Sequence, residues 1–431
     1  MKTANKLLVD LRVALVQLNP QIGKIQETTL RAKSLLNQFK VVLDKKKDNR
    51  SPDLIVFPEF ALTGYNFTSR EHILPYICRT EQSASFKFAQ DVSKQFNCYT
   101  VIGYPESEND SKEILYNSAV VVSPAGEMVF NYRKSFLYFT EDNWGCKENP
   151  NQFQNFPLTF KQRATRVGSD TVDRSDVTLK TSIGICMDLS PYKFEAPFND
   201  FEFSSYNVDN NVELIICPMA WLHSSSITKQ DYEIEETGGD DIPSKLSEIA
   251  ENLKDQGLPL SGSQDDFQID LDQDNVTSRL SKTSPAVDHE YTKLSEPDMT
   301  NVNYWILRFL PFLHLNVRYF WWQDKVLTDV CTELKRKTYM GASAKKAWEF
   351  SGKNAVLLLT NRCGVEDGNT VFAGSSGVYK FNGRDDFSSE ELLKDDNKRL
   401  DSTNPSVELY GNLGKGKEGI IMRDITFEVD R

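Results

Sequence analysis

Short apolar runs alternate with longer amphipathic stretches along most of the 431 residues. The apolar runs are rich in Val and Ile, which is typical of buried β-strands. They predict strands at 11–18, 53–57, 99–104, 116–122, 181–186, 212–217 and 355–360. Between the first two, apolar side chains recur at helical spacing: Leu35, Leu36, Phe39, Val42 and Leu43. Strands that alternate with helices predict an α/β fold.

Two further patterns extend this picture. Ser123-Pro124-Ala125-Gly126 lies between apolar runs and predicts a hairpin turn. Residues 303–320 and 326–350 are expected to form helices. The aromatic side chains that begin at Tyr304 are more typical of a core than of a binding groove, and we assign them no chemistry.

The net charge of −12 comes from one segment. Residues 224–300 hold 18 acidic and 6 basic side chains, which leaves 44 of each kind in the rest of the chain. This acidic, aromatic-poor stretch cannot bury enough apolar surface to offset the entropy of ordering it unless it packs against another part of the protein. We therefore expect a single domain over 1–431 with a partly mobile acidic insertion at 224–300. The remaining chain is neutral and has no basic stripe, which argues against nucleic-acid binding.

Composition places the protein in a reducing compartment. Hydrophobic residues make up 39% of the chain, enough for a sizeable core. No apolar run reaches the ~18 residues of a membrane-spanning helix, and the N-terminal residues do not resemble a secretory signal. The seven cysteines are scattered without a CxxC pair, so neither a disulfide framework nor a zinc site is indicated. A cytoplasmic location is expected.

Two chemically capable side chains follow predicted buried strands, where open α/β sheets bind ligands. Glu59 follows the run Leu54-Ile-Val-Phe-Pro, and an apolar setting there would make it a better general base. The alternative is a Glu that caps the following turn. Cys186 follows a strand and Gly184, which permits close backbone approach, so its thiol could be a nucleophile. The alternative is a buried cysteine that acts only as a small hydrophobe.

A third candidate is a cation. Lys134 precedes Glu141 and Asp142 by seven and eight residues, with Trp144 close by. A buried lysine could stabilise an oxyanion and favour a nearby thiolate, although most lysines are solvated at the surface.

A cysteine protease would instead need a histidine beside the thiol. His289 lies in the acidic segment and His314 in the aromatic stretch, which leaves His72 and His223 open as partners. The local signatures of papain-like and caspase-like enzymes are absent.

Taken together, Glu59, Lys134 and Cys186, within FPEF, YRK and GICMD, resemble the catalytic set of the nitrilase superfamily of carbon-nitrogen hydrolases. The resemblance extends from about residue 11 to residue 380. It includes the segments 13–18, 218–221, 361–366 and 372–376. It implies a nitrilase-like αββα four-layer sandwich.

Three sequence segments are most similar to those of the fungal protein N-terminal amidases: YFTEDNW, CMDLSPYKFEAPF and NYWILRFLPF. Such enzymes convert the N-terminal Asn or Gln of a polypeptide to Asp or Glu, release ammonia and feed an N-degron degradation pathway. One position departs from the superfamily pattern, which often has an arginine two residues beyond the Asp. Leu189 and Ser190 follow Asp188 here, which would leave the Asp188 carboxylate free for substrate.

The resemblance also implies roles for the residues. Glu59 would take the proton of Cys186, the thiolate would attack the side-chain amide, and Lys134 with the backbone N–H of Met187 would bind the oxyanion. Glu141 matches a second acid that positions the lysine or the substrate. Its neighbour Asp142 is the alternative for that role.

The substrate's α-ammonium calls for a carboxylate near the thiol, and Asp188 and Glu195 are the candidates. A turn hydrogen bond is the structural alternative for Asp188, and a solvated edge is the alternative for Glu195. Trp144 is a further candidate for contact with substrate. No metal or organic cofactor is implied. Polypeptides with N-terminal Asn or Gln are the expected partners, with neither nucleic acid nor membrane, and the oligomeric state is left open.

Two other functions stay open. One is a small-molecule amidase, nitrilase or carbamoyl hydrolase with the same Glu, Lys and Cys. The other is a catalytically silent scaffold whose acidic insertion binds a partner.

Overall fold

The computed structural model describes residues 6–46, 48, 50–168, 173–223, 226, 266–269, 294–313, 350, 352–367, 370–383 and 407–431. Most of the acidic segment lies outside this part of the chain. So do His289, His314 and, but for its last residue, the predicted helix at 326–350.

Thirteen strands form one mixed sheet, and two short strands form a separate hairpin. The sheet consists of β1 (Lys6–Gln17), β2 (Leu54–Val56), β3 (Tyr99–Ser107), β4 (Leu115–Val122), β5 (Met128–Arg133), β6 (Asn155–Arg166), β7 (Ser175–Ile183), β8 (Leu214–Met219), β9 (Asp266–Ile269), β10 (Ala355–Asn361), β13 (Gly377–Phe381), β14 (Val407–Asn412) and β15 (Glu418–Asp430). The hairpin pairs β11 (Val365–Glu366) with β12 (Thr370–Val371). Each predicted strand coincides with an observed one, except that the run at 181–186 ends its strand at Ile183.

The strand order is β14-β13-β10-β8-β7-β6-β1-β2-β3-β4-β5, and β15 pairs with β1 over twelve residues of each strand. Three strands run parallel in each half of this order: β1, β2 and β3 in one, and β7, β8 and β10 in the other. The carboxyl ends of parallel strands lie at one edge of a sheet, which is where this fold class places ligands.

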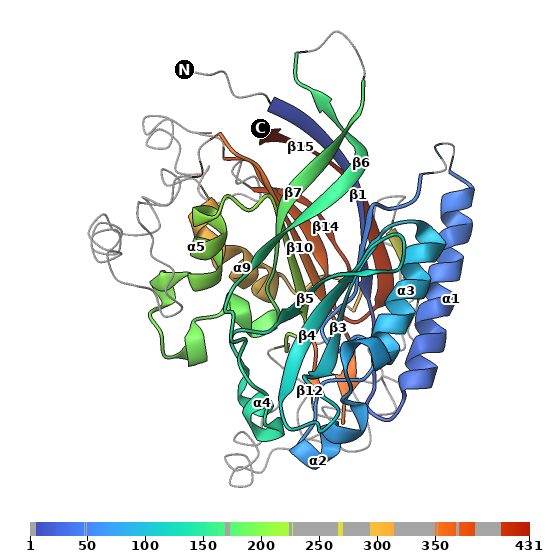
Figure 1. Ribbon diagram of the computed structural model, residues 1–431, viewed down its shortest axis with the longest axis vertical. Helices are drawn as coiled ribbons and strands as arrows, with labels where there is room; N and C mark the ends of the chain where they lie inside the picture. Colours follow the sequence, from blue (N-terminus) through green and yellow to red (C-terminus); the bar gives the residue numbers. More distant parts are fainter. Residues whose placement is uncertain are drawn as a thin grey trace.

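The helices are α1 (Ile25–Asp44), α2 (Arg70–Ile73), α3 (Ala84–Phe96), α4 (Phe139–Trp144), α5 (Glu202–Asp209) and α9 (Met299–Leu307). Short 3₁₀ turns are η1 (Leu74–Tyr76), η2 (Thr80–Gln82), η3 (Cys186–Leu189), η4 (Tyr192–Phe194), η5 (Phe198–Asp200) and η6 (Leu310–Phe312). Helices α1 and α3 lie on one side of the strands, and α5 and α9 lie on the opposite side (Figure 1). None of the described helices is long and apolar enough to span a bilayer.

Alternating side chains of β1 separate two apolar cores. Val9, Leu11, Val13 and Leu15 belong to one core, and Ala14 and Val16 belong to the other. The second core lies against α1 and α3, whereas the first continues onto β7, β8 and β10 and reaches α5 and α9. The two halves of the one continuous sheet pack on each other through the first core, so the layers are arranged as helix, sheet, sheet and helix. This arrangement is the predicted αββα sandwich.

Two predicted features, a turn and a helix, can be compared directly with the structure. The turn at Ser123–Gly126 joins β4 to β5, with Gly126 at φ +85° and its N–H donating to the Ser123 carbonyl (2.8 Å). The helix predicted at 303–320 is wrong in its bounds, since α9 spans Met299–Leu307. Asp298 caps its first turn by accepting from the Asn301 N–H, and Pro311 cannot continue a helix.

The acidic segment contributes one described strand to the sheet. Its residues Asp266–Ile269 form β9, which pairs antiparallel with β15 through Glu418–Ile421. A part of the predicted insertion is therefore integrated into the sheet, which we did not expect from its composition.

Candidate active site

Four segments that follow strands meet at one place in the fold. Glu59 follows β2, Lys134 follows β5, Cys186 follows β7 and Ala220 follows β8. Because β2, β7 and β8 each have a parallel neighbour, their carboxyl ends deliver these residues to one edge. Each of these candidate residues therefore lies shortly after the end of a strand.

Glu59 is fully buried and both of its oxygens are engaged. Oε1 accepts hydrogen bonds from Lys134 Nζ (2.9 Å) and Asn117 Nδ2 (2.6 Å), and Oε2 accepts from the Ala220 N–H (2.6 Å). Gly103 of β3 makes room for this segment, because a Cβ there would lie 2.6 Å from Glu59 Cα. The residue after it, Phe60, has φ +47°, a strained value for a bulky side chain.

Lys134 is fully buried between two carboxylates. Its Nζ lies 2.9 Å from Glu59 Oε1 and 3.0 Å from Glu141 Oε2. Burial alone would lower the pKa of Lys134, but attraction to Glu141 and Glu59 outweighs it and the pKa is raised. The lysine is therefore a permanent ammonium in this setting, and the surface alternative for Lys134 does not apply.

Glu141 completes the charged cluster from α4. Its Oε2 accepts from the backbone N–H of Tyr138 (2.6 Å), and Asn117 Nδ2 donates to its Oε1. Burial raises the pKa of Glu141, Lys134 lowers it and the charge of Glu59 raises it again. Its neighbour Asp142 is exposed, so Glu141 is the acid that the fold brings to Lys134.

Cys186 opens the turn η3 directly after β7 and is 7% exposed. Its backbone has φ +44°, a left-handed conformation that costs energy for a residue with a Cβ and is found most often at functional sites. Burial raises the pKa of the Cys186 thiol, and the charge of Glu59 raises it further against the opposing effect of Lys134. Gly184 admits the ring of Phe203, which would lie 2.5 Å from an added Cβ.

Asp188 is held entirely by the protein. Its Oδ1 accepts from the N–H groups of Ser135 (3.0 Å) and Phe136 (2.7 Å), and its Oδ2 accepts from the Tyr132 hydroxyl (2.9 Å) and the Ile185 N–H (2.7 Å). Burial raises its pKa to about 7, although the backbone donors lower it. The expectation that this carboxylate is free for substrate does not match these contacts. The turn hydrogen bond, which was the structural alternative, is what the fold provides.

The other two predicted substrate contacts, Glu195 and Trp144, differ in their burial. Glu195 is exposed at the end of η4. Trp144 is fully buried, donates its Nε1–H to the Phe67 carbonyl and stacks on Phe60 at 5.8 Å between ring centroids. Trp144 thus supports the segment that carries Glu59 rather than facing the thiol.

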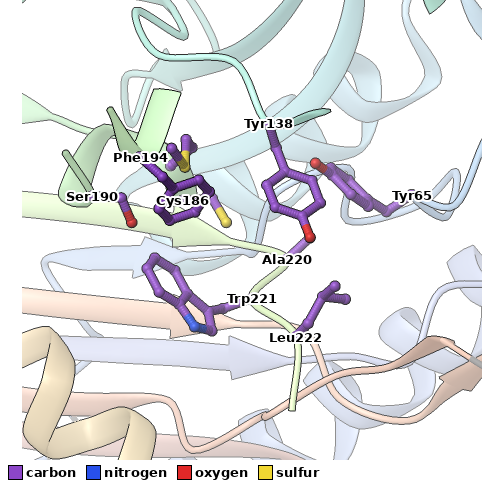
Figure 2. Close-up of a pocket in the computed structure, with 9 residues that line it drawn as sticks. Tyr65, Tyr138, Cys186, Ser190, Phe194, Ala220, Trp221 and Leu222 are labelled. Atoms are coloured by element: carbon purple, nitrogen blue, oxygen red, sulfur yellow. The ribbon is translucent and has the colours of Figure 1, made fainter. Parts of the chain in front are cut away.

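A cavity of about 170 Å³ opens beside Cys186 (Figure 2). Its lining consists of Tyr65, Tyr138, Cys186, Met187, Ser190, Phe194, Ala220, Trp221 and Leu222. Of the predicted substrate-binding residues, Met187 lies in this wall, and Asp188, Glu195 and Trp144 do not. Cys186, the predicted nucleophile, also lies in the wall. The other lining residues were not proposed as substrate contacts from the sequence, where an isolated Tyr or Ser carries no distinguishing local signal.

The two described histidines belong to other contacts. His223 pairs with Asp298 (3.5 Å), and the ring of His72 packs edge-on against Phe67. The charged neighbours that act on the Cys186 thiol are Glu59, Lys134 and Glu141. Within the described part of the chain, no group of three or more His, Cys, Asp or Glu side chains is placed to hold a metal ion.

The chain is similar to known proteins in both sequence and fold. Residues 12–190 match the family described as carbon-nitrogen hydrolase. Over the whole chain, the sequence is 48% identical to the protein N-terminal amidase of Saccharomyces cerevisiae, of which it covers 98%.

Solved structures of an N-terminal amidase are also similar to this chain. One was crystallised with a Gln-Gly peptide and has a TM-score of 0.76 at 47% identity, covering 99% of this chain and 100% of that one. Another, with an Asn-Glu-Ala peptide, has a TM-score of 0.76 at 48% identity and the same coverage.

Proposed function

Because the chain belongs to the carbon-nitrogen hydrolase family, whose members act on amide C–N bonds, we propose that it deamidates N-terminal Asn or Gln of polypeptides. The products would be N-terminal Asp or Glu and ammonia. The observation that carries this proposal is Lys134, locked between Glu59 and Glu141 beside a cavity that contains Cys186. A base, a fixed cation and a thiol are the groups that amide hydrolysis through a thioester requires.

The first step needs a base, because burial raises the pKa of the Cys186 thiol and so favours its protonated form. Glu59 takes this proton as the sulfur attacks the carbon of the side-chain amide, so a free thiolate need not accumulate. The left-handed turn at Cys186 presents its Sγ to the cavity (Figure 2).

The attack moves negative charge onto the amide oxygen. Lys134 is held at its position by two carboxylates, so it needs no reorganisation when the charge develops. The backbone N–H of Met187, next to the nucleophile in the cavity wall, is the second donor in this proposal. Glu141 acts by positioning Lys134.

The intermediate collapses when Glu59 returns the proton to the nitrogen, and the C–N bond breaks to release ammonia. The acyl group then remains on Cys186 as a thioester. Glu59 next takes a proton from a water that attacks this thioester, and the thiol leaves with that proton. The net reaction exchanges the amide NH₂ for OH and consumes one water.

Two observations favour a polypeptide N-terminus over a free small amide. A cavity of about 170 Å³ is close in size to a pocket that holds one benzene-sized group, so it fits one side chain and leaves the rest of a peptide outside. Phe139 and Phe194 lie exposed beside it, with ring centroids 5.5 Å apart, and offer a surface for the second and later residues of the peptide. The solved relatives carry peptides that begin with Gln or Asn.

Mass spectrometry of peptides that start with Asn or Gln tests the proposal. Each should gain about one mass unit, the change from NH₂ to OH, and Cys186→Ala should lower the rate by at least ~10⁴-fold because the covalent route is lost. Near-UV circular dichroism checks that the variant is folded.

Acetylation of the substrate N-terminus is the sharper control. It removes the ammonium and adds bulk, so turnover should fall by at least ~100-fold, and an internal Asn should be inert. Acetylated and free peptides that react within a factor of three would contradict an N-terminal amidase. A marked preference for free asparagine or a nitrile would favour the small-molecule enzyme instead.

A further inference from the structure

One polar side chain in the cavity wall has no partner within the described part of the protein. Ser190 is fully buried, and its Oγ makes no hydrogen bond to any described residue. Its position is set by the turn after the nucleophile, because its N–H donates to the Met187 carbonyl (2.9 Å). A buried hydroxyl without a partner destabilises the folded state, so its presence in a cavity points to a ligand group that completes it.

The surroundings of this hydroxyl are almost entirely carbon. Phe194, Trp221 and Tyr138 contribute aromatic rings to the same cavity, and Figure 2 shows Ser190 and Cys186 on one side of it with Trp221 below them. Aromatic faces attract cations, most strongly when water is excluded. A wall of aromatic rings that also carries hydroxyls, of which the buried Ser190 hydroxyl has no partner among the described residues, therefore suits a small cation that needs a hydrogen-bond acceptor.

The two carboxylates that were expected to bind the substrate ammonium do not line this cavity. Asp188 already accepts four hydrogen bonds, and Glu195 is exposed outside the cavity lining. Glu59 and Glu141 are bound to Lys134, Asn117 and the backbone. Asp188, Glu59 and Glu141 are therefore already paired within the protein, and Glu195 is not part of the cavity lining.

We propose that the Ser190 hydroxyl accepts a hydrogen bond from the α-ammonium of the substrate, while the ring faces of Trp221 and Tyr138 stabilise its remaining charge. This inference rests on the proposed function and names the group that selects an N-terminal residue. In Asn, three bonds join the amide carbon to the α-nitrogen, a span of about 3–4 Å at ~1.5 Å per bond. One cavity wall that carries Cys186 and Ser190 can therefore engage both ends of the side chain.

A neutral acceptor also suits the chemistry better than a carboxylate would. The charge of Glu59 already raises the pKa of the Cys186 thiol. A further carboxylate in the cavity would oppose formation of the thiolate in the same way. A hydroxyl binds the ammonium without adding this charge.

The test is a double-mutant cycle between the protein hydroxyl and the substrate amine. Wild type and Ser190→Ala are assayed on an Asn-Gly peptide and on its desamino analogue, in which the α-ammonium is replaced by hydrogen. We expect kcat/KM of the variant to fall about 10- to 100-fold on the Asn peptide, the effect of losing a charge-assisted hydrogen bond. The rate on the desamino analogue should stay within about twofold, and Ser190→Thr should restore the Asn peptide.

Thermal unfolding gives an independent readout. Removing an unpartnered hydroxyl should leave the Tm of Ser190→Ala equal to or above that of wild type. Ser182→Ala is the matched control, because its buried Oγ donates to Asn207 Oδ1 (2.6 Å). That variant should have a lower Tm and unchanged discrimination between the two peptides.

The outcomes distinguish a failure of the Ser190 role from a failure of the proposed function. Equal losses on both peptides, or no loss on either, would overturn the role of Ser190 while leaving deamidation intact. A wild-type enzyme that is active on small amides and inactive on the Asn peptide would overturn the proposed function, and this inference with it.

Discussion

Glu59, Lys134 and Glu141 form a charged cluster in which each group is held by another: Lys134 contacts Glu59 and Glu141 at 2.9 and 3.0 Å, and all three are fully buried. The wall of the cavity beside Cys186 has a different composition. It presents aromatic rings and the Ser190 hydroxyl, which has no partner among the described residues.

The difference separates two tasks of an enzyme site. Groups that stabilise charge in the transition state act best when they are fixed beforehand, which the mutual contacts of the cluster accomplish. Groups that select a substrate act best when their bonding capacity is completed only by that substrate. We therefore expect substitutions in the cluster to change kcat and stability together, and substitutions in the wall to change substrate choice.

The largest effect should come from breaking the cluster. Glu141→Gln removes one of the two carboxylates that hold Lys134, so kcat should fall about 10²- to 10³-fold, and the loss of a buried ionic partner should cost about 3 kcal/mol of unfolding free energy. Steady-state kinetics and chemical denaturation measure the two changes.

Glu106→Gln is the matched control, because Glu106 is also buried and pairs with Arg133 at 2.8 Å outside the site. It should lose a similar amount of stability and keep kcat within about threefold. If Glu106→Gln lowered kcat as much as Glu141→Gln, the fall in kcat would be explained by loss of stability and not by the position of Lys134.

The next effect concerns the protonation state of the thiol in the resting enzyme. The raised pKa of Cys186 means that the thiolate fraction should increase tenfold per pH unit from pH 7 to pH 9, or about 100-fold in all. The rate of alkylation by iodoacetamide, followed at the Cys186 peptide by mass spectrometry, should rise in proportion. A plateau below about pH 8 would show a preformed thiolate and remove the need for Glu59 to act as base in the first step.

The smallest effect tests the cavity wall. Trp221→Phe removes the bond from Nε1 to Asn301 Oδ1 (3.0 Å), worth about 1 kcal/mol, so KM for an Asn peptide should rise about fivefold with kcat unchanged. Trp305→Phe is the control, since the buried Nε1 of Trp305 has no partner among the described residues. The Trp305→Phe substitution makes the same change in side-chain size as Trp221→Phe, and it should leave KM for the Asn peptide unchanged. Equal shifts in KM for the two variants would assign the effect to packing.

The strands of the core and the residues at their ends could be read from the sequence. Runs such as 54–56 and 214–219 are buried on both faces, so they appear as continuous apolar stretches. Strands with one exposed face, such as β5, β6 and β15, were not predicted, because their alternating pattern is weaker than a continuous run. Glu59, Lys134 and Cys186 stood out because each belongs to a short local pattern that resembles a known family.

Only the tertiary structure shows which polar side chains near the thiol already have hydrogen-bond partners within the protein. Asp188 looked free from its neighbours in the sequence, yet two of its four donors come from residues 135 and 136, more than fifty positions away. In the sequence, Ser190 is notable only because it stands where the superfamily often has an arginine. Its place in the cavity wall depends on segments around residues 65, 138, 190 and 221, which only the tertiary structure brings together. A local sequence influences backbone conformation, whereas a hydrogen bond between distant segments depends on how the layers pack. That packing places the Ser190 hydroxyl in the cavity wall without a partner among the described residues.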